Sequence, residues 1–377
     1  MKQMTITRIL KCAALLLPIV IVLLLSQHLL LSYADANTDR IHDFYNEPEQ
    51  SMDVVLLGAS ELFADFSPAY AYEQHGFTSY LYAQDANPGS LYLSQLKEIT
   101  ARQSPDVIFV EINGFLYSND EMLRDEARLR IYTESIPWSA NKIRTIMEYD
   151  YADKLSCFFP FIKYHGDWKD LGTLKYRLDM KTKSYSHPSL LKGIYTRTIT
   201  DTVPVLTLNK AEDTKTEPIT QLSEQYLRAF LDYCKAEELK VVFLRCPHKL
   251  VDEGTLYSFR QANRVGEIVA EYGFDFVNLD KETAAIGIND LTDFYNSDHL
   301  NVYGQQKLTD YLGKLIMDDY GVIPMKQPAE QRAAWSYAAD TVNRFYTYAE
   351  EHLQNGTDGW LYETPALLSE LAESIKS

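Results

Sequence analysis

Short apolar runs and amphipathic stretches alternate along most of the chain. Five runs predict buried β-strands, at 52–58, 78–83, 105–112, 239–247 and 274–279. Stretches with helical periodicity lie around 68–75, around 89–101, at 219–237, at 260–273 and from 303 onward. Continuous apolar runs separated by amphipathic helices are typical of parallel strands that are covered on both faces. The pattern therefore predicts an α/β fold with a doubly wound, mainly parallel five-stranded sheet.

Two segments depart from this alternation. Residues 118–205 are rich in aromatic and charged residues and contain few clean strands, so we expect a helical insertion over one edge of the sheet. Residues 326–377 have the pattern of two or three helices, which would form a helical C-terminal extension. The main domain is accordingly expected at 51–325, after a juxtamembrane linker at 37–50.

The N-terminal segment is strongly apolar. No Asp, Glu, Lys or Arg occurs at 12–34, whereas Lys2, Arg8 and Lys11 precede this stretch. About 20 apolar residues in a helix span the core of a bilayer, so 1–36 is predicted to be a single-pass transmembrane anchor. The positive flank places the bulk of the chain outside the cytoplasm, at the cell membrane.

A cleaved signal peptide is the alternative for the same segment. It is supported by the shorter uninterrupted apolar run at 12–25 and by the Ala-Asp-Ala sequence at 34–36, which has the small-x-small pattern of a cleavage site. The three leucines at 29–31 continue the apolar stretch and favour the anchor.

Composition narrows the classes of function. The 377-residue chain is 46% hydrophobic, enough for a large core, and its formal net charge is −17. Such a charge argues against binding nucleic acid through a general basic surface. The sequence has no Gly-rich phosphate loop and no Asp, His or Cys cluster with metal-ligand spacing, so we expect neither a metal nor another cofactor.

Residues with catalytic potential follow the predicted strands. They are Ser60 after the first strand, Asn87 and the backbone of Ala86 after the second, Asn113 after the third, His248 after the fourth and His299 after the fifth. The carboxyl ends of parallel strands share one edge of a sheet, where ligands commonly bind. A serine, an asparagine and a histidine should therefore project from the same edge.

These residue types fit acyl transfer. A serine hydroxyl becomes a strong nucleophile when a histidine takes its proton, and the tetrahedral oxyanion then needs hydrogen-bond donors. The Ser60 backbone N–H, an N–H near Ala86 and Asn87, and the Asn113 side chain could supply these donors. Gly58 would let the chain turn tightly beneath the serine.

Each of these features also has a plain structural explanation. Gly-x-Ser is common after strands, Asn-Gly forms turns, and Ser or Asp caps helices. We expect His248 to face the substrate or to be structural. The joint order along the chain is what favours a catalytic site.

Three segments resemble a known family. "LLGASELFADFSP", "VEINGF" and "DFYNSDHLNVYGQQKLTDYL" are similar to the first, third and fifth sequence blocks of SGNH (GDSL-type) hydrolases and acyltransferases, over roughly 51–120 and 220–320. The N-terminal segment also resembles those of extracytoplasmic proteins of envelope acylation, such as the teichoic acid D-alanine transfer protein and the alginate O-acetylation proteins. The resemblance implies a flavodoxin-like SGNH fold, with Ser60 as nucleophile and His299 as general base. It also implies that the Ser60 N–H and Asn113 are oxyanion donors.

One position departs from the family pattern. The family commonly has Asp three residues before the histidine, where this chain has Asn296, while Asp298 directly precedes His299. Asn can orient the ring but cannot stabilise an imidazolium as a carboxylate does. We favour Asp298 as the third catalytic residue, with Asn296 and then the more distant Asp293 as alternatives.

Three functions are compatible with this sequence. The first is an extracytoplasmic SGNH-type O-acyltransferase that transfers acetyl or D-alanyl groups to a cell-envelope polysaccharide or teichoic acid and receives them from an integral-membrane acyltransferase partner. The second is an SGNH esterase that removes acyl groups. The third is a catalytically inactive, anchored glycan-binding protein, for which Asn296 is the best argument. The predicted anchor and outside location favour the first.

Overall fold

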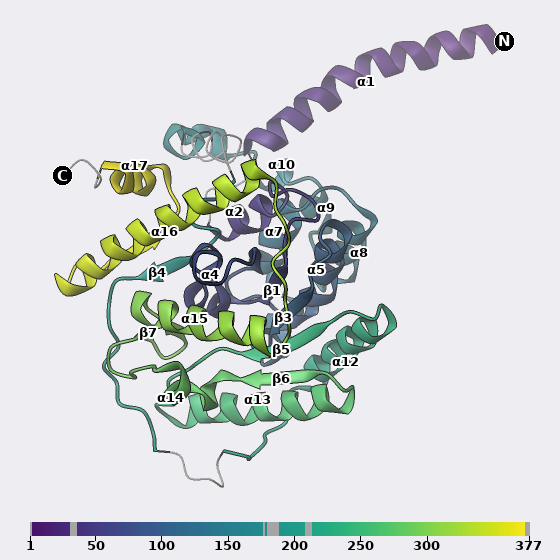
Figure 1. Cartoon of the computed structure of the whole chain (residues 1–377). Coiled ribbons are helices and arrows are strands. Elements are labelled where there is room, and N and C mark those ends of the chain that lie inside the picture. Colours follow the sequence, from purple (N-terminus) through teal and green to yellow (C-terminus); the bar gives the residue numbers. More distant parts are fainter. Residues whose placement is uncertain (1, 31–35, 176–177, 179–187, 208–212, 374–377) are drawn as a thin grey trace.

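A five-stranded parallel sheet forms the centre of the molecule. The computed structural model describes residues 2–30, 36–175, 178, 188–207 and 213–373. The strands are β1 (Val54–Gly58), β2 (Ser79–Ala83), β3 (Val107–Glu111), β5 (Val241–Arg245) and β6 (Asp275–Asn278). They lie in the order β2-β1-β3-β5-β6, and all neighbours are parallel (Figure 1). All five predicted strands are present, which confirms the α/β fold with a parallel five-stranded sheet.

Helices cover both faces of this sheet. One face carries α3 (Ser60–Asp65), α4 (Pro68–His75), α15 (Val302–Asp318) and α16 (Ala329–Gln354). The other face carries α5 (Gly89–Arg102), α12 (Gln221–Ala236) and α13 (Glu253–Glu271). Successive residues of β1 point to opposite faces of the sheet. Val54 and Leu56 pack into the core on the first face, and Val55 and Leu57 pack into the core on the second. The arrangement is consistent with a doubly wound fold, and the strand order is one of the two common orders of that fold.

The segment expected to be an insertion is helical over most of its described part. It contains α6 (Asn119–Leu123), α7 (Glu126–Ser135), α8 (Ala140–Glu148), α9 (Lys154–Phe158) and α10 (Phe161–Tyr164). Tyr132 of α7 and Ile146 of α8 are fully buried in the same cluster as Tyr82 of the edge strand β2. These helices therefore extend the core beyond that edge of the sheet.

The C-terminal segment is joined to this insertion by a small sheet. β4 (Tyr195–Arg197) pairs with β9 (Trp360–Tyr362) in antiparallel register, and α17 (Pro365–Glu373) follows. Tyr195 stacks on Trp360 at 5.1 Å between ring centroids, and it also packs edge-on against Phe63 of α3. The insertion therefore contacts α3, which begins with Ser60, and the C-terminal segment packs on the same tyrosine.

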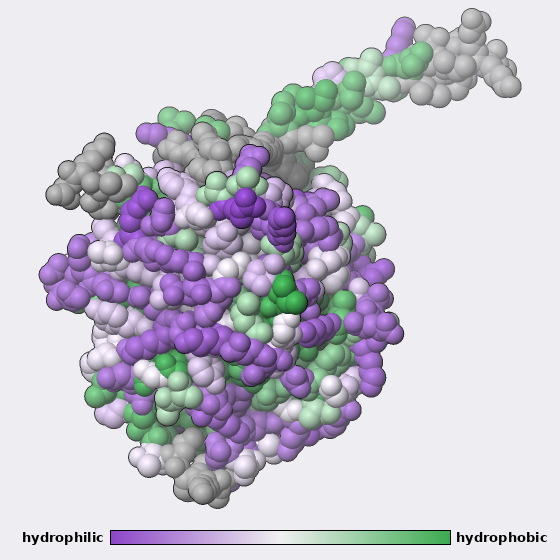
Figure 2. Space-filling model, viewed as in Figure 1, coloured by the Kyte–Doolittle hydropathy of each residue, from purple (hydrophilic) through white to green (hydrophobic). Residues whose placement is uncertain are grey.

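The N-terminal segment forms one long helix. α1 (Lys2–Leu30) projects away from the body (Figure 1), and Figure 2 shows apolar residues along it, in contrast to the mostly polar visible face of the body. None of the helices in the described part of the chain combines the length and the apolar character needed to cross a bilayer. The transmembrane helix that the sequence predicts is therefore not found among the described residues. The alternative cleavage motif at 34–36 lies mostly outside the described residues.

The expected linker contains a packed helix. α2 (Ala36–Asp43) buries Ile41 in the core beside the sheet, and its Arg40 guanidinium lies 3.7 Å from the ring centroid of Phe63. Arg40 Nε also donates to the Gly193 carbonyl at 2.8 Å. Residues 36–43 are thus tied to α3 and to the insertion.

Candidate functional site

The two segments that carry the predicted serine and histidine lie against each other. Ser60 is the first residue of α3, directly after β1, and His299 begins β8 (His299–Leu300), which pairs with β7 (Phe294–Asn296). The Leu300 N–H donates to Asp65 Oδ1 at 2.8 Å, and Gln305 Nε2 donates to the Ala64 carbonyl at 2.7 Å. Segments more than two hundred positions apart in the sequence therefore lie side by side next to the end of β1.

Gly58 permits this geometry through close packing. A Cβ at position 58 would lie 2.6 Å from Glu111 Cβ and 2.7 Å from Leu62 Cδ1. We expected a glycine that frees the backbone for a tight turn, but the packing of β3 and α3 on this residue is what excludes a side chain. The same packing fixes the start of α3 and hence the position of Ser60.

Asn113 is held by three neighbours. Its N–H donates to Glu111 Oε1 at 2.8 Å, and its Oδ1 accepts from Arg245 Nη1 at 2.7 Å. Because the arginine fixes the oxygen side of the amide, the Nδ2 group must point the other way, where it donates to Glu61 Oε1. The predicted oxyanion donor is therefore oriented, and in this structure its acceptor is the carboxylate of the residue after Ser60.

Asn296, and not Asp298, orients the histidine ring. His299 Nδ1 lies 2.9 Å from Asn296 Oδ1, so this nitrogen carries the hydrogen. Asp298 Oδ1 instead accepts from Ser297 Oγ at 3.1 Å. On this geometry Asn296 orients the ring in place of Asp298, our preferred residue, because Asp298 lies in the turn between β7 and β8 and its carboxylate is bound to Ser297. Tyr295 stacks on the His299 ring, with centroids 5.2 Å apart and an interplanar angle of 3°, which fixes the ring plane.

The loop after β2 contributes a structural contact. Asn87 is fully buried, and its Nδ2 donates to the Gly58 carbonyl at 2.8 Å and to Gln95 Oε1 at 2.9 Å. The Asn87 side chain therefore fixes the end of β1. Ala86 has φ 44°, a left-handed conformation that favours glycine.

His248 belongs to a buried network of charges. Its Nδ1 lies 2.7 Å from the Cys246 carbonyl and 3.3 Å from Asp280 Oδ1, and Asp280 Oδ2 accepts from Arg245 Nε at 3.0 Å. Burial and Arg245 would lower the pKa of His248, but the carboxylates of Asp280 and Glu61 outweigh them and raise it to about 10. His248 is therefore a buried imidazolium at neutral pH.

Two buried carboxyl groups lie beneath the serine with opposite pKa shifts. Burial and the charge of Glu61 raise the pKa of Glu111 to about 8. Burial would also raise the pKa of Glu61, but His248 and His299 outweigh it and lower that pKa to about 2. At neutral pH Glu61 is ionised and Glu111 is protonated, as expected for neighbouring carboxyls of which one has cationic partners.

His299 is suited to accept a proton. Burial lowers its pKa below the usual value, although the charges of Glu61 and Asp298 oppose this effect. The ring is therefore neutral at pH 7. Its Nε2 is buried and has no hydrogen-bond partner among the described residues, which leaves it open to take a proton.

A cavity of about 560 Å³ adjoins the site. Its walls include Asn113, His248 and Asp298 from the predicted set. Hydroxyl, amide and aromatic side chains make up much of the rest, namely Tyr117, Ser118, Thr220, Thr255, Tyr257, Ser258 and Gln261. Such walls combine stacking surfaces with neutral hydrogen-bonding groups.

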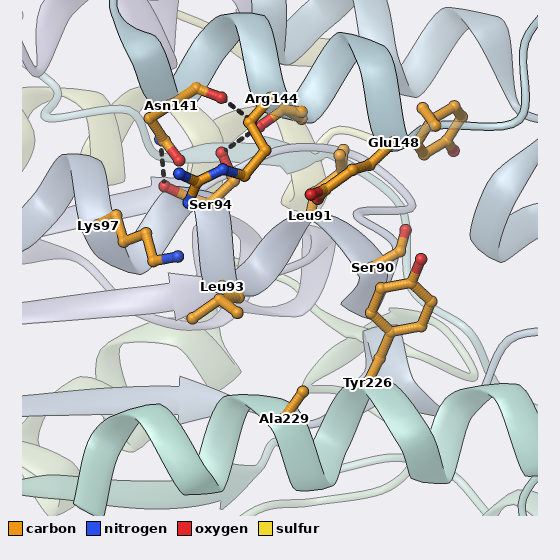
Figure 3. Close-up of a pocket in the computed structure, with 12 residues that line it drawn as sticks. Ser90, Leu91, Leu93, Ser94, Lys97, Asn141, Arg144, Glu148, Tyr226 and Ala229 are labelled. Atoms are coloured by element: carbon orange, nitrogen blue, oxygen red, sulfur yellow. Dashed lines mark hydrogen bonds between the residues drawn. The ribbon is translucent and has the colours of Figure 1, made fainter. Parts of the chain in front are cut away.

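A second cavity, of about 240 Å³, lies among α5, α8 and α12 (Figure 3). Lys97, Arg144 and Leu93 are among its lining residues, and Asn141 Nδ2 bonds to the Ser94 carbonyl at 2.9 Å across it. The cavity belongs to the helical layer and not to the strand ends. The predicted site residues, all of which the structure describes, are absent from its walls.

Sequence reasoning missed the charged residues of this site. Glu61, Glu111, Arg245 and Asp280 were not predicted, and neither was Tyr295. A signal was present, because Glu111 and Arg245 end otherwise apolar strands that are buried on both faces, where an ionisable residue requires a specific partner.

No protein-family model matches the chain, and no curated protein matches it at a significant level. The similarity to SGNH enzymes therefore rests on the three sequence segments. In the described part of the chain, no group of three or more His, Cys, Asp or Glu residues is placed to hold a metal ion.

Proposed function

We propose that this protein is a serine-dependent O-acyltransferase of the SGNH type that acylates a cell-envelope polysaccharide or teichoic acid. The observation that carries the proposal is the gathering of Ser60, Asn113 and His299 around Glu61. Ser60 Oγ and Asn113 Nδ2 both donate to its carboxylate, and β8, which begins with His299, is bound to α3 through the hydrogen bond from the Leu300 N–H to Asp65 Oδ1. This arrangement supports Ser60 as the nucleophile, Asn113 as an oxyanion donor and His299 as the base.

The proposed reaction has two acyl-transfer steps. Ser60 Oγ attacks the acyl carbonyl of the donor while His299 Nε2 takes the hydroxyl proton, and the oxyanion accepts hydrogen bonds from Asn113 Nδ2 and the Ser60 N–H. His299 then protonates the leaving group, which leaves an acyl-Ser60 ester. In the second step the acceptor hydroxyl loses its proton to His299 and attacks that ester. The acyl group moves to the acceptor, and Ser60 regains its proton.

The acceptor class is supported by the adjoining cavity. Tyr117 and Tyr257 offer faces for stacking, and Thr255, Ser258 and Gln261 offer neutral donors and acceptors. Sugar rings present both apolar faces and hydroxyl groups, so a glycan acceptor suits these walls. The acyl group, acetyl or D-alanyl, and its supply by an integral-membrane acyltransferase are part of the proposal. A location outside the cytoplasm is proposed from the charge pattern of the N-terminal segment.

Esterase activity is the second candidate, because the same acyl-enzyme releases the acyl group when water replaces the acceptor. Catalytic inactivity is the third. It is favoured by one observation, the amide of Asn296 at the position where a carboxylate commonly orients the histidine.

A labelling and transfer experiment tests the proposal. A fluorophosphonate probe should label wild type at Ser60 and leave Ser60→Ala unlabelled. With p-nitrophenyl acetate as donor, a glycan oligosaccharide should gain the mass of one acetyl group in the presence of wild type. Labelling that persists in Ser60→Ala would remove the serine from the mechanism. Release of acetate without acceptor acetylation would favour the esterase.

A further inference from the structure

We propose that Glu61 keeps the site in a resting state by occupying the place of the oxyanion, and that the productive site forms when its carboxylate moves to His248. This inference rests on the proposed function. It assigns to Glu61 and His248 a role in controlling access to Ser60.

Glu61 accepts hydrogen bonds from the proposed nucleophile, Ser60, and from the proposed oxyanion donor, Asn113. Its side chain is buried on α3, where Oε1 accepts from Asn113 Nδ2 and Oε2 lies 3.4 Å from Ser60 Oγ, which donates to it. An oxyanion on the Ser60 adduct would require that same Asn113 donor. A fixed negative charge at this place would also repel the oxyanion.

The Asn113 amide cannot turn away to serve both acceptors. Arg245 Nη1 holds its Oδ1 at 2.7 Å, and Arg245 is itself buried and paired with Asp280. The Nδ2 group therefore has one direction available, and Glu61 and an oxyanion must compete for it. Ser60 is only 9% exposed in this arrangement, so an acyl donor needs a rearrangement to reach it.

Two imidazole nitrogens are left without partners by the same arrangement. His299 Nε2 and His248 Nε2 are both buried, and neither has a hydrogen-bond partner in the described part of the chain. His248 Nδ1 already faces the Cys246 carbonyl and Asp280, so the imidazolium carries its second hydrogen on Nε2. That N–H lies 3.9 Å from Glu61 Oε1, beyond hydrogen-bond length.

A short movement of the Glu61 carboxylate would give His248 Nε2 a partner and release the catalytic groups. If Glu61 Oε1 closes on His248 Nε2 to about 2.8 Å, a charge-assisted hydrogen bond forms between two buried ions. Asn113 Nδ2 is then free for the acyl oxygen, and the Ser60 hydroxyl is free to turn to His299 Nε2. His248 is thus the acceptor site that lets a buried carboxylate leave the catalytic groups.

Fluorophosphonate labelling of the full-length chain tests this exchange. Glu61→Ala removes the competitor, so the labelling rate at Ser60 should rise tenfold or more, and Glu61→Gln should give a smaller rise because it removes the charge alone. His248→Asn removes the alternative partner and should lower the rate tenfold or more. The double variant Glu61→Ala/His248→Asn should label as fast as Glu61→Ala, since without the carboxylate no partner is needed. Glu73→Gln, which changes an exposed carboxylate on α4, is the matched control and should label like wild type.

The outcomes separate this inference from the proposed function. Labelling of Glu61→Ala that is equal to or slower than that of wild type, with Ser60→Ala unlabelled, overturns the resting-state role and leaves the acyl-enzyme in place. A double variant as slow as His248→Asn also overturns it, since His248 would then act by another route. Labelling in Ser60→Ala, or in none of the variants, rejects the proposed function and this inference with it.

Discussion

At the scale of single residues, the amide beside His299 is the least usual part of the site. A carboxylate at this position would stabilise the imidazolium that forms when the ring takes a proton, whereas the Asn296 oxygen supplies a neutral hydrogen bond of 2.9 Å. The charge of Asp298 acts on His299 without a direct bond, since its carboxylate is turned to Ser297. Orientation and charge are therefore supplied by different side chains.

Asn296→Asp should raise the turnover of p-nitrophenyl acetate, because it places a carboxylate on the Nδ1–H. Asn296→Ala should lower turnover more than Asp298→Asn does, since only the first change removes the bond that orients the ring. The loss of an orienting carboxylate costs ~10⁴ in turnover in the serine protease template, which is an upper guide here. Steady-state measurement of turnover for the three variants and wild type shows which residue orients the ring. A larger loss in Asp298→Asn would return the orienting role to that residue.

The buried carboxyl of Glu111 predicts a pH effect on stability. Its pKa is raised from 4.5 to about 8 on folding, so between these values the folded chain retains a proton that the unfolded chain has lost. The free energy of unfolding then falls as pH rises through this window, by at most ~1.4 kcal/mol per pH unit from this group. Glu111→Gln should keep the bond to the Asn113 N–H and remove this dependence.

Urea unfolding at several pH values measures this effect. The difference in free energy of unfolding between Glu111→Gln and wild type should grow in favour of the variant from pH 5 to pH 8. A difference that stays constant with pH would mean that Glu111 is ionised in the folded protein.

At the scale of elements, the strands were predictable and the charges beneath them were not. A parallel strand covered on both faces is a continuous apolar run, and each run in the sequence became a strand. Ser60 and Asn113 follow the ends of β1 and β3, as the pattern predicts, whereas His299 lies in β8, well beyond the end of β6. The pairing of Glu61 with Asn113 could not follow from sequence, because it depends on how α3 packs against the loop after β3. The choice between Asn296 and Asp298 likewise depended on side-chain directions in the β7–β8 turn.

The junction of β1, α3 and β3 predicts the effect of Gly58→Ala. The new Cβ would contact Glu111 and Leu62 far inside van der Waals distance, so the free energy of unfolding should fall by about 1–3 kcal/mol. Acyl-transfer activity should fall as well, since α3 carries Ser60. Gly166→Ala is the control, because its Cβ would meet no atom within 4 Å and its φ is −83°. Equal stability of Gly58→Ala and wild type would show that α3 shifts without cost.

At the scale of the whole molecule, the C-terminal helix α16 is part of the main core. Ala338, Val342, Phe345 and Ala349 lie at helical spacing on one face of α16 and are buried in the same cluster as β1, α4 and α15. The sequence predicts a helical extension here, but its amphipathic pattern alone does not say which surface it covers. Figure 1 shows α16 lying along the α4 face of the body.

Phe345→Ala should therefore destabilise the whole domain and not only the C-terminal segment. The side chain is fully buried, and truncation of a buried phenylalanine costs about 3–5 kcal/mol because it loses apolar contact and leaves a cavity. Urea unfolding followed by both circular dichroism and tryptophan fluorescence should show one transition at a lower midpoint. Tyr337→Ala, on the same helix and 54% exposed, is the control and should leave the midpoint nearly unchanged. Two separate transitions in Phe345→Ala would mean that α16 unfolds independently. The single transition is expected because Phe345 and the β1 residue Val54 share one core, so losing the helix exposes the face of the sheet that supports α3 and Ser60.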